Sequence, residues 1–105
     1  MPAYMIVTCH ITDREAFING YGKAAAALVA RHGGRYLLRA PGGEVLEGDL
    51  APGPSMVISE WPDKAAVHAF WNSPEYREAV KLRENISTCQ VVVVEAPSIA
   101  EVLNA

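Results

Sequence analysis

Four segments with alternating hydrophobic residues and two intervening stretches with helical spacing follow one another as strand, helix, strand, strand, helix, strand. This order is typical of the ferredoxin-like split βαβ arrangement. Gly and Pro residues at most of the junctions mark the turns between the segments. The sequence therefore predicts an α+β domain, with an antiparallel sheet that carries helices on one face only.

The length and composition limit the architecture and the kinds of partner. The chain has 105 residues, half of them apolar, which suits one domain; we expect it over residues 1–96, followed by a tail over residues 97–105. The net charge is only −3 and Lys and Arg are scattered, so no nucleic-acid partner is expected. No apolar run is long enough for a membrane span, and residues 1–4 lack the basic start of a signal peptide. We therefore expect a cytoplasmic protein without a membrane partner.

The first predicted strand covers residues 3–11 and has one apolar and one mixed face. Its apolar face carries Met5, Val7, Cys9 and Ile11. Its mixed face carries Tyr4, Ile6, Thr8 and His10. The mixed face can hold polar groups, and we expect it to face the interior of a barrel.

A continuous helix is expected from residue 12 to residue 32. Thr12 and Glu15 match the capping box that begins many helices. The apolar stripe of this helix consists of Phe17, Tyr21, Ala24 and Leu28. The pair Gly33-Gly34 then ends it, because glycine readily takes the left-handed conformation that follows a helix.

The second and third strands are predicted over residues 35–40 and 55–61, joined by a loop rich in Pro and Gly. Strict alternation places Arg35 and Arg39 on the same side of the second strand. In the third strand, Glu60 shares a side with Met56 and Ile58, and because both sides are mostly apolar we expect this strand inside the sheet.

Two short helices and a fourth strand complete the domain. Asp63 and Ser73 are the expected N-caps of the helices, and Arg83 falls on the otherwise apolar side of the second one. The strand covers residues 88–95, and its four consecutive valines predict burial on both faces. One helical turn is expected in the tail, through Ile99, Val102 and Leu103.

The face of the sheet without helices is expected to lie against a second copy of the chain. It presents apolar residues from three strands, namely Tyr4, Ile6, Met56, Ile58 and the outward valines. A soluble monomer rarely leaves such a patch exposed. The sequence therefore predicts a homodimer in which the two sheets form a shared barrel.

Five short segments resemble the family known as domain of unknown function 1330. They are Met1-Pro2-Ala3-Tyr4, His32-Gly33-Gly34-Arg35-Tyr36-Leu37, Leu46-Glu47-Gly48, Glu60-Trp61-Pro62 and Asn72-Ser73-Pro74-Glu75-Tyr76-Arg77. The resemblance covers residues 1–95 and implies a dimeric α+β barrel, in the superfamily of cofactor-free monooxygenases, muconolactone isomerases and haem-degrading enzymes. The family itself implies no activity. Its members typically have Phe where this chain has Trp61, a difference expected to affect packing more than chemistry.

Glu60 and His10 are the candidate catalytic residues. A carboxylate beside Met56 and Ile58 is partly desolvated, which raises its pKa toward the range of a general base. Alternatively, Glu60 forms a buried structural ion pair with Arg39 or Arg35. His10 is either an acid or base or a hydrogen-bonded wall residue.

The candidate ligand-binding residues are Arg39, Arg35, Tyr4, Trp71 and Tyr76. Arginine suits bidentate contact with a carboxylate, although both arginines are equally explained as solvated edge residues. Trp71 and Tyr76 are candidates for a pocket entrance, although aromatic residues at helical spacing more often belong to a core.

No metal site and no cofactor are expected. The sequence has no histidine pair with a carboxylate at metal-ligand spacing, no phosphate loop and no catalytic-triad signature. Cys9 and Cys89 are expected to lie close together, because the first and fourth strands pair, but to remain thiols in a reducing compartment.

Three functions stay open on the sequence alone. The first is binding of a small acidic or aromatic molecule between the sheet and the helices. The second is a cofactor-independent monooxygenase or isomerase with Glu60 as base, so that enzyme activity is undecided. The third is a structural or regulatory dimer without a pocket.

Overall fold

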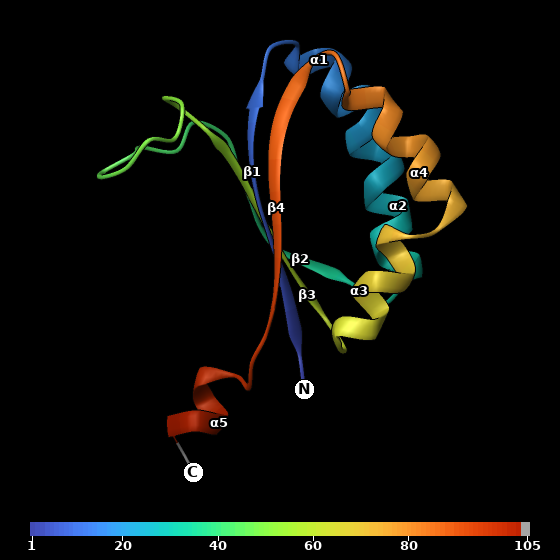
Figure 1. Cartoon of the computed structure of the whole chain (residues 1–105), viewed down its shortest axis with the longest axis vertical. Helices are drawn as coiled ribbons and strands as arrows, with labels where there is room; N and C mark the ends of the chain where they lie inside the picture. Colours follow the sequence, from blue (N-terminus) through green and yellow to red (C-terminus); the bar gives the residue numbers. More distant parts are fainter. Residues whose placement is uncertain (104–105) are drawn as a thin grey trace.

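The computed structural model describes residues 1–103, and over these residues it shows a four-stranded antiparallel sheet with helices against one face (Figure 1). The strands lie in the order β2-β3-β1-β4. They are β1 (Ala3–Ile11), β2 (Arg35–Ala40), β3 (Ser55–Trp61) and β4 (Ser87–Glu95). The helices are α1 (Arg14–Phe17), α2 (Lys23–Arg31), α3 (Lys64–Trp71), α4 (Pro74–Val80) and α5 (Ile99–Leu103), with a π-helical turn η1 (Ile18–Gly22) and a 3₁₀ turn η2 (Lys81–Arg83). The predicted ferredoxin-like fold is confirmed.

The first helix begins one residue later than the capping box predicted. The Asp13 side chain accepts a hydrogen bond of 3.1 Å from the Ala16 amide, so Asp13 is the N-cap. The amide of Thr12 instead donates to the carbonyl of Ile86, 2.8 Å away, which ties the end of β1 to the start of β4. The prediction that Thr12 caps this helix was therefore wrong. Asp63 and Ser73 do cap α3 and α4 as predicted.

The expected continuous helix is interrupted by the π-helical turn η1 between α1 and α2. A π turn holds one residue more than an α turn. The expected stripe still packs in or against the core through Tyr21, Ala24 and Leu28, and Ala25 is buried as well. Tyr21 and Gly22 belong to the turn itself, and the turn places both of them at the cavity described below.

The two glycines after α2 serve different purposes. Gly33 has a φ of +88°, the left-handed conformation expected at a helix end. Gly34 lies against the core: a Cβ at this position would come within 2.8 Å of Trp61 Cε2 and of Val29 Cγ1. Both contacts involve packed side chains, so the chain requires the absence of a side chain there.

Gly34→Ala is therefore expected to lower the free energy of unfolding by about 1–3 kcal/mol, the usual cost of overpacking a core. Urea denaturation followed by tryptophan fluorescence measures the change. Gly20→Ala is the matched control, because its Cβ would meet only Leu82 Cβ at an ordinary 3.9 Å and alanine favours a helix. Equal stability of the two variants would contradict the steric account of Gly34.

Strand β2 contains an irregularity that reverses the expected side of one arginine. The pairing of β2 with β3 shifts between Tyr36 and Leu38, leaving Leu37 without a partner in the ladder. Such a bulge inverts the alternation beyond it. Arg35 lies opposite Glu60, whereas Arg39 lies opposite Val57, whose side chain faces the helices. The prediction that the two arginines share one side was wrong.

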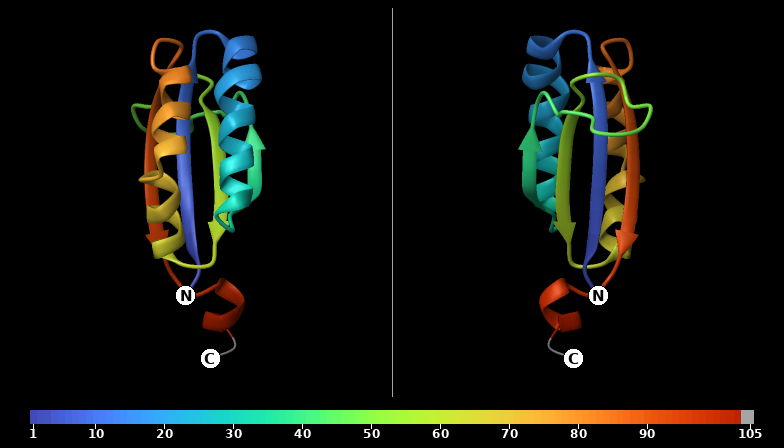
Figure 2. Two further views of the ribbon diagram at one scale, coloured as in Figure 1. Left: turned by 90° about the vertical axis from the view of Figure 1, so that its right-hand side faces the viewer. Right: turned by 90° about the vertical axis from the view of Figure 1, so that its left-hand side faces the viewer.

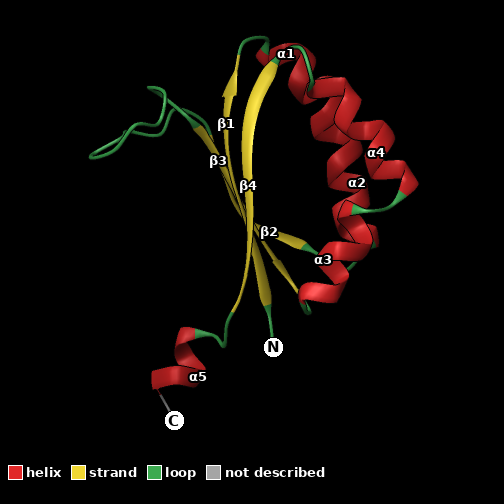
Figure 3. Cartoon of the chain, viewed as in Figure 1, coloured by secondary structure: helices red, strands yellow, loops and turns green. Residues whose placement is uncertain are grey.

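The open face of the sheet bears the outward residues of all four strands, and no helix within residues 1–103 covers it (Figures 2 and 3). On β4, Val91 and Val93 pack toward the core, but Val92 and Val94 are 54% and 42% exposed. The expectation that this strand is buried on both faces was therefore wrong for the single chain. The 41–54 loop projects on this side (Figure 1).

The tail forms the expected helical turn as α5, which lies apart from the other helices at the open-face side of the sheet (Figure 1). Its apolar side chains Ile99, Val102 and Leu103 are all exposed. In residues 1–103 no helix is both long and apolar enough to cross a membrane.

Candidate functional site

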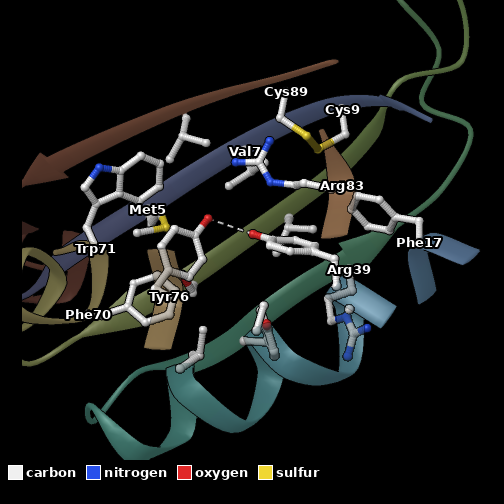
Figure 4. Close-up of a pocket in the computed structure, with 18 residues that line it drawn as sticks. Met5, Val7, Cys9, Phe17, Arg39, Phe70, Trp71, Tyr76, Arg83 and Cys89 are labelled. Carbon is white, nitrogen blue, oxygen red and sulfur yellow. Dashed lines mark hydrogen bonds between the residues drawn. A yellow bond between two sulfur atoms is a disulfide. The ribbon is translucent and has the colours of Figure 1, made fainter. Parts of the chain in front are cut away.

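A cavity of about 80 Å³ lies between the sheet and the helices (Figure 4). The sheet contributes mainly aliphatic side chains to its wall, among them Met5, Val7, Val57 and Val91. The helices contribute a set of aromatic rings, Phe17, Tyr21, Phe70, Trp71 and Tyr76. Apolar walls with a few polar groups are the usual construction of a small-molecule site.

Three of the polar groups form one cluster that comes from η1, α4 and η2. The hydroxyls of Tyr21 and Tyr76 are 2.9 Å apart and share a hydrogen bond. The guanidinium of Arg83 lies over the ring of Tyr21, with its central carbon 5.0 Å from the ring centre. Burial, and then the neighbouring Tyr76, raise the pKa of Tyr21 above its ordinary value. Both the burial of Tyr21 and its shared hydrogen bond favour a neutral phenol.

Arg83 is the least satisfied polar residue of this cluster. Its Nε is buried and finds no hydrogen-bond acceptor among the described residues. Burial by itself would lower the pKa of Arg83, but the hydroxyl oxygens of Tyr76 and Tyr21 outweigh it and raise the pKa. The cavity therefore holds a permanent positive charge with a free donor, an arrangement that suits a carboxylate or another oxyanion.

Neither Tyr21 nor Arg83 was among the predicted site residues. Tyr21 was assigned to the core because it lies on a helical stripe. Arg83 did carry a signal, since a guanidinium on an otherwise apolar helix side is unusual. What the sequence could not provide was the partner element, because 62 residues (83 − 21) separate Arg83 from Tyr21.

Arg39, Trp71 and Tyr76, three of the five predicted ligand-binding residues, line the cavity. The bulge at Leu37 turns Arg39 to this side, where its guanidinium stacks over Tyr36 at 4.9 Å. Tyr76 is buried in the core and also lines the cavity, so the two interpretations offered for these aromatic residues are compatible.

The other two, Arg35 and Tyr4, lie with Glu60 on the open face. Arg35 Nη2 is 2.6 Å from Glu60 Oε1, and its Nε donates to the same oxygen at 2.8 Å. The Arg35 side chain is 72% exposed and the Glu60 side chain 27%. The ion pair is therefore not buried, although the alternative for Glu60 had assumed a buried pair. The hydrogen bond from Arg35 holds the pKa of Glu60 below its ordinary value. In the single chain, the expected rise of this pKa was therefore wrong.

His10 also lies outside the cavity. It is an exposed residue near the end of β1, opposite Thr88 of β4. With Thr8 and Asp49 it lines a separate hollow beside the 41–54 loop. Within residues 1–103, no group of three or more His, Cys, Asp or Glu residues is placed to hold a metal ion.

Cys9 and Cys89 form a disulfide between β1 and β4, at directly paired positions with Cα atoms 4.2 Å apart. The prediction that the two cysteines lie close together is confirmed. The prediction that they remain thiols is wrong for this structure. The pairing follows from the antiparallel register, which brings two positions 80 residues apart into contact. Both side chains line the cavity.

Comparison with solved structures shows the same fold in proteins of low sequence identity. A protein of unknown function from Rhodopseudomonas palustris superposes with a TM-score of 0.75 at 22% identity, covering 92% of this chain and 83% of that chain. SnoaB, a cofactor-independent oxygenase from Streptomyces nogalater, gives 0.68 at 15% identity, with 92% and 94% covered.

A dimeric protein of unknown function and ferredoxin-like fold from Bacteroides fragilis gives a TM-score of 0.59 at 20% identity, with 90% of this chain and 96% of that chain covered. No curated protein matches the sequence. The model of the family described as "Domain of unknown function (DUF1330)" matches residues 2–97. Since this match spans nearly the whole chain, the protein belongs to the DUF1330 family.

Proposed function

We propose that the protein binds a small molecule that carries a carboxylate or another oxyanion on a planar or apolar body, in the cavity between the sheet and the helices. The observation that carries the proposal is Arg83, which lines an aromatic cavity and whose buried Nε has no acceptor among the described residues. A buried donor left unpaired costs about 1–3 kcal/mol. A bound oxyanion would remove that cost.

The other lining residues suit the rest of such a ligand. The ring of Tyr76 packs against those of Phe70 and Trp71, and all three residues line the cavity. Arg39 is largely exposed and stands at the same cavity, so it is placed to attract an anion from solvent. Arg39, Trp71 and Tyr76 therefore remain proposed ligand-binding residues, now with Arg83 as the central anchor.

Arg83→Met is expected to weaken carboxylate binding about 10-fold to 100-fold, because a hydrogen bond to a charged group contributes about 1.5–3 kcal/mol. Calorimetric titration with carboxylates from acetate to benzoate, each paired with its neutral amide, measures the effect. The wild type should prefer each acid to its amide, and the variant should lose that preference.

Arg31→Met is the control, since Arg31 is an exposed arginine at the end of α2 and does not line the cavity. It should retain the preference for acids. Equal affinity of the wild type for acids and amides, or the same loss in both variants, would refute the proposed role of Arg83.

A cofactor-independent monooxygenase or isomerase is the second candidate, supported by the likeness to SnoaB. Its weakness is the lack of a base: among residues 1–103, no Asp or Glu lines the cavity, and Glu60 is paired with Arg35 on the open face. The catalytic roles of Glu60 and His10 therefore stay predictions. Oxygen uptake can be measured with the acids that bind. If Arg83→Met abolished the uptake and Glu60→Gln retained it, the reaction would take place in the cavity.

A dimer without a binding function is the third candidate. It was expected to have no pocket, whereas the cavity beneath the helices counts in favour of a ligand. A cytoplasmic location and the absence of a nucleic-acid partner stay predictions as well.

We also propose that the protein is a homodimer joined through the open face. Leu38, Val92 and Val94 are all more than two fifths exposed there, and a contiguous apolar patch is typical of an interface. In a face-to-face dimer, the Arg35–Glu60 pair and Tyr4 would lie at the rim or within the shared barrel. The similar protein from Bacteroides fragilis is dimeric, which supports a dimer.

Val92→Glu is expected to convert the protein to a monomer, because a charge in the centre of an apolar interface is left unpaired on association. Light scattering coupled to gel filtration gives the mass before and after the change. Leu82→Glu, at a similarly exposed residue on the helical side of the molecule, should leave the mass unchanged. A monomeric wild type would exclude the dimer.

A further inference from the structure

The Cys9–Cys89 disulfide is part of the cavity wall, which gives it a place in the chemistry of the site. Both side chains point from β1 and β4 toward the helices and line the cavity. Cys9 is 5% exposed, whereas Cys89 is half-buried and is the more accessible of the two. A small molecule in the cavity would therefore meet the disulfide.

A basic side chain and a hydroxyl group lie at the same end of the cavity as the disulfide. Figure 4 shows the disulfide and Arg83 at the same end of the cavity, away from Trp71. The Ser87 hydroxyl donates to the carbonyl of Arg83 at 2.8 Å, and Cys89 Sγ lies 3.7 Å from that hydroxyl oxygen. A nearby guanidinium stabilises a thiolate and so favours both its formation and its departure as a leaving group.

We propose that the cavity is a site of thiol–disulfide exchange for small thiols that carry a carboxylate. The proposal rests on the proposed function, because Arg83 would hold the carboxylate of the thiol as it would hold that of any acidic ligand. The cavity volume of about 80 Å³ is small, since one water molecule needs about 10–15 Å³ of it, and this favours short mercapto acids as substrates.

The exchange proceeds in two balanced steps. The thiolate of the mercapto acid attacks Cys89 Sγ, the bond between Cys89 and Cys9 breaks, and Cys9 leaves as a thiolate that takes up a proton. A second thiolate attacks the outer sulfur of the mixed disulfide and releases Cys89 as a thiolate. Two molecules of the mercapto acid are thereby oxidised to their disulfide, and the protein disulfide is reduced by two electrons.

The test compares mercaptoacetate with the neutral 2-mercaptoethanol as reductants of the purified, oxidised protein. Samples are alkylated at intervals, and mass spectrometry gives the rate at which protein thiols appear. This rate is normalised to the thiolate concentration of each reagent. Mercaptoacetate should react about tenfold faster than mercaptoethanol, at the low end of electrostatic rate enhancement. Arg83→Met should abolish the difference, Arg83→Lys should keep most of it, and Arg31→Met should keep all of it.

A second measurement does not depend on the folding of the arginine variants. In Cys9→Ser, which leaves one thiol, the disulfide of mercaptoacetate should form a mixed disulfide with Cys89 faster than the disulfide of mercaptoethanol does. Equal rates in both experiments, or a purified protein with two titratable thiols under air, would overturn the proposal. Acetate binding without any rate preference would refute the exchange alone, whereas a failure of all acids to bind would refute the proposed function.

Discussion

Reduction of the Cys9–Cys89 disulfide is expected to lower the free energy of unfolding by about 4 kcal/mol. The bond closes a loop of 80 residues, and a cross-link over that length removes much of the conformational freedom of the unfolded chain. The folded state changes little, because Cys9 and Cys89 are already paired across the β1–β4 ladder. Urea denaturation with and without a strong reductant measures the difference.

The double variant Cys9→Ala/Cys89→Ala separates the cross-link from other effects of the reductant. Its denaturation midpoint should be the same with and without reductant, and close to that of the reduced wild type. An unchanged midpoint on reduction of the wild type would mean that the two sulfurs do not cross-link the protein in solution.

Replacing Trp61 by alanine is expected to cost about 3–5 kcal/mol, the range for removing a large aromatic side chain from a core. Trp61 is 1% exposed, its ring centre lies 5.1 Å from that of Phe70, and its Nε1 donates to Ser59 Oγ at 2.8 Å. A domain of this size has a total stability of only about 5–15 kcal/mol. The variant should therefore lose a large share of its total stability.

Trp61→Phe is the matched control, because phenylalanine keeps most of the apolar area and removes only the hydrogen bond and one ring. It should lose less than half as much stability as Trp61→Ala in thermal or urea denaturation. If the two variants were equally destabilised, the hydrogen bond to Ser59 would contribute more than the packing of the indole ring.

The strands and helix ends were the most predictable part of the fold. The bounds of β1, β2 and β3 match the predictions, and β4 begins one residue earlier. These elements depend on local patterns, namely alternation in strands and the capping residues Asp63 and Ser73. Local patterns act between residues a few positions apart, which is why the sequence alone is sufficient for them.

The two local irregularities were not predictable, and both determine the site. The bulge at Leu37 moves Arg39 into the cavity and separates it from Arg35. The π turn places Tyr21 beside Tyr76. A bulge or a π turn adds one residue without changing the composition of the segment, so a periodicity argument does not detect it.

The sequence by itself determined the element order, the ferredoxin-like fold, the family and the closeness of Cys9 to Cys89. Only the tertiary structure decided which polar residues share a site. Arg83 meets Tyr21 and Tyr76 in the cavity, whereas Glu60 meets Arg35 on the opposite face of the sheet. The physical reason is that the face on which a side chain lies follows from one-residue shifts in register, and these shifts are set by packing between distant segments.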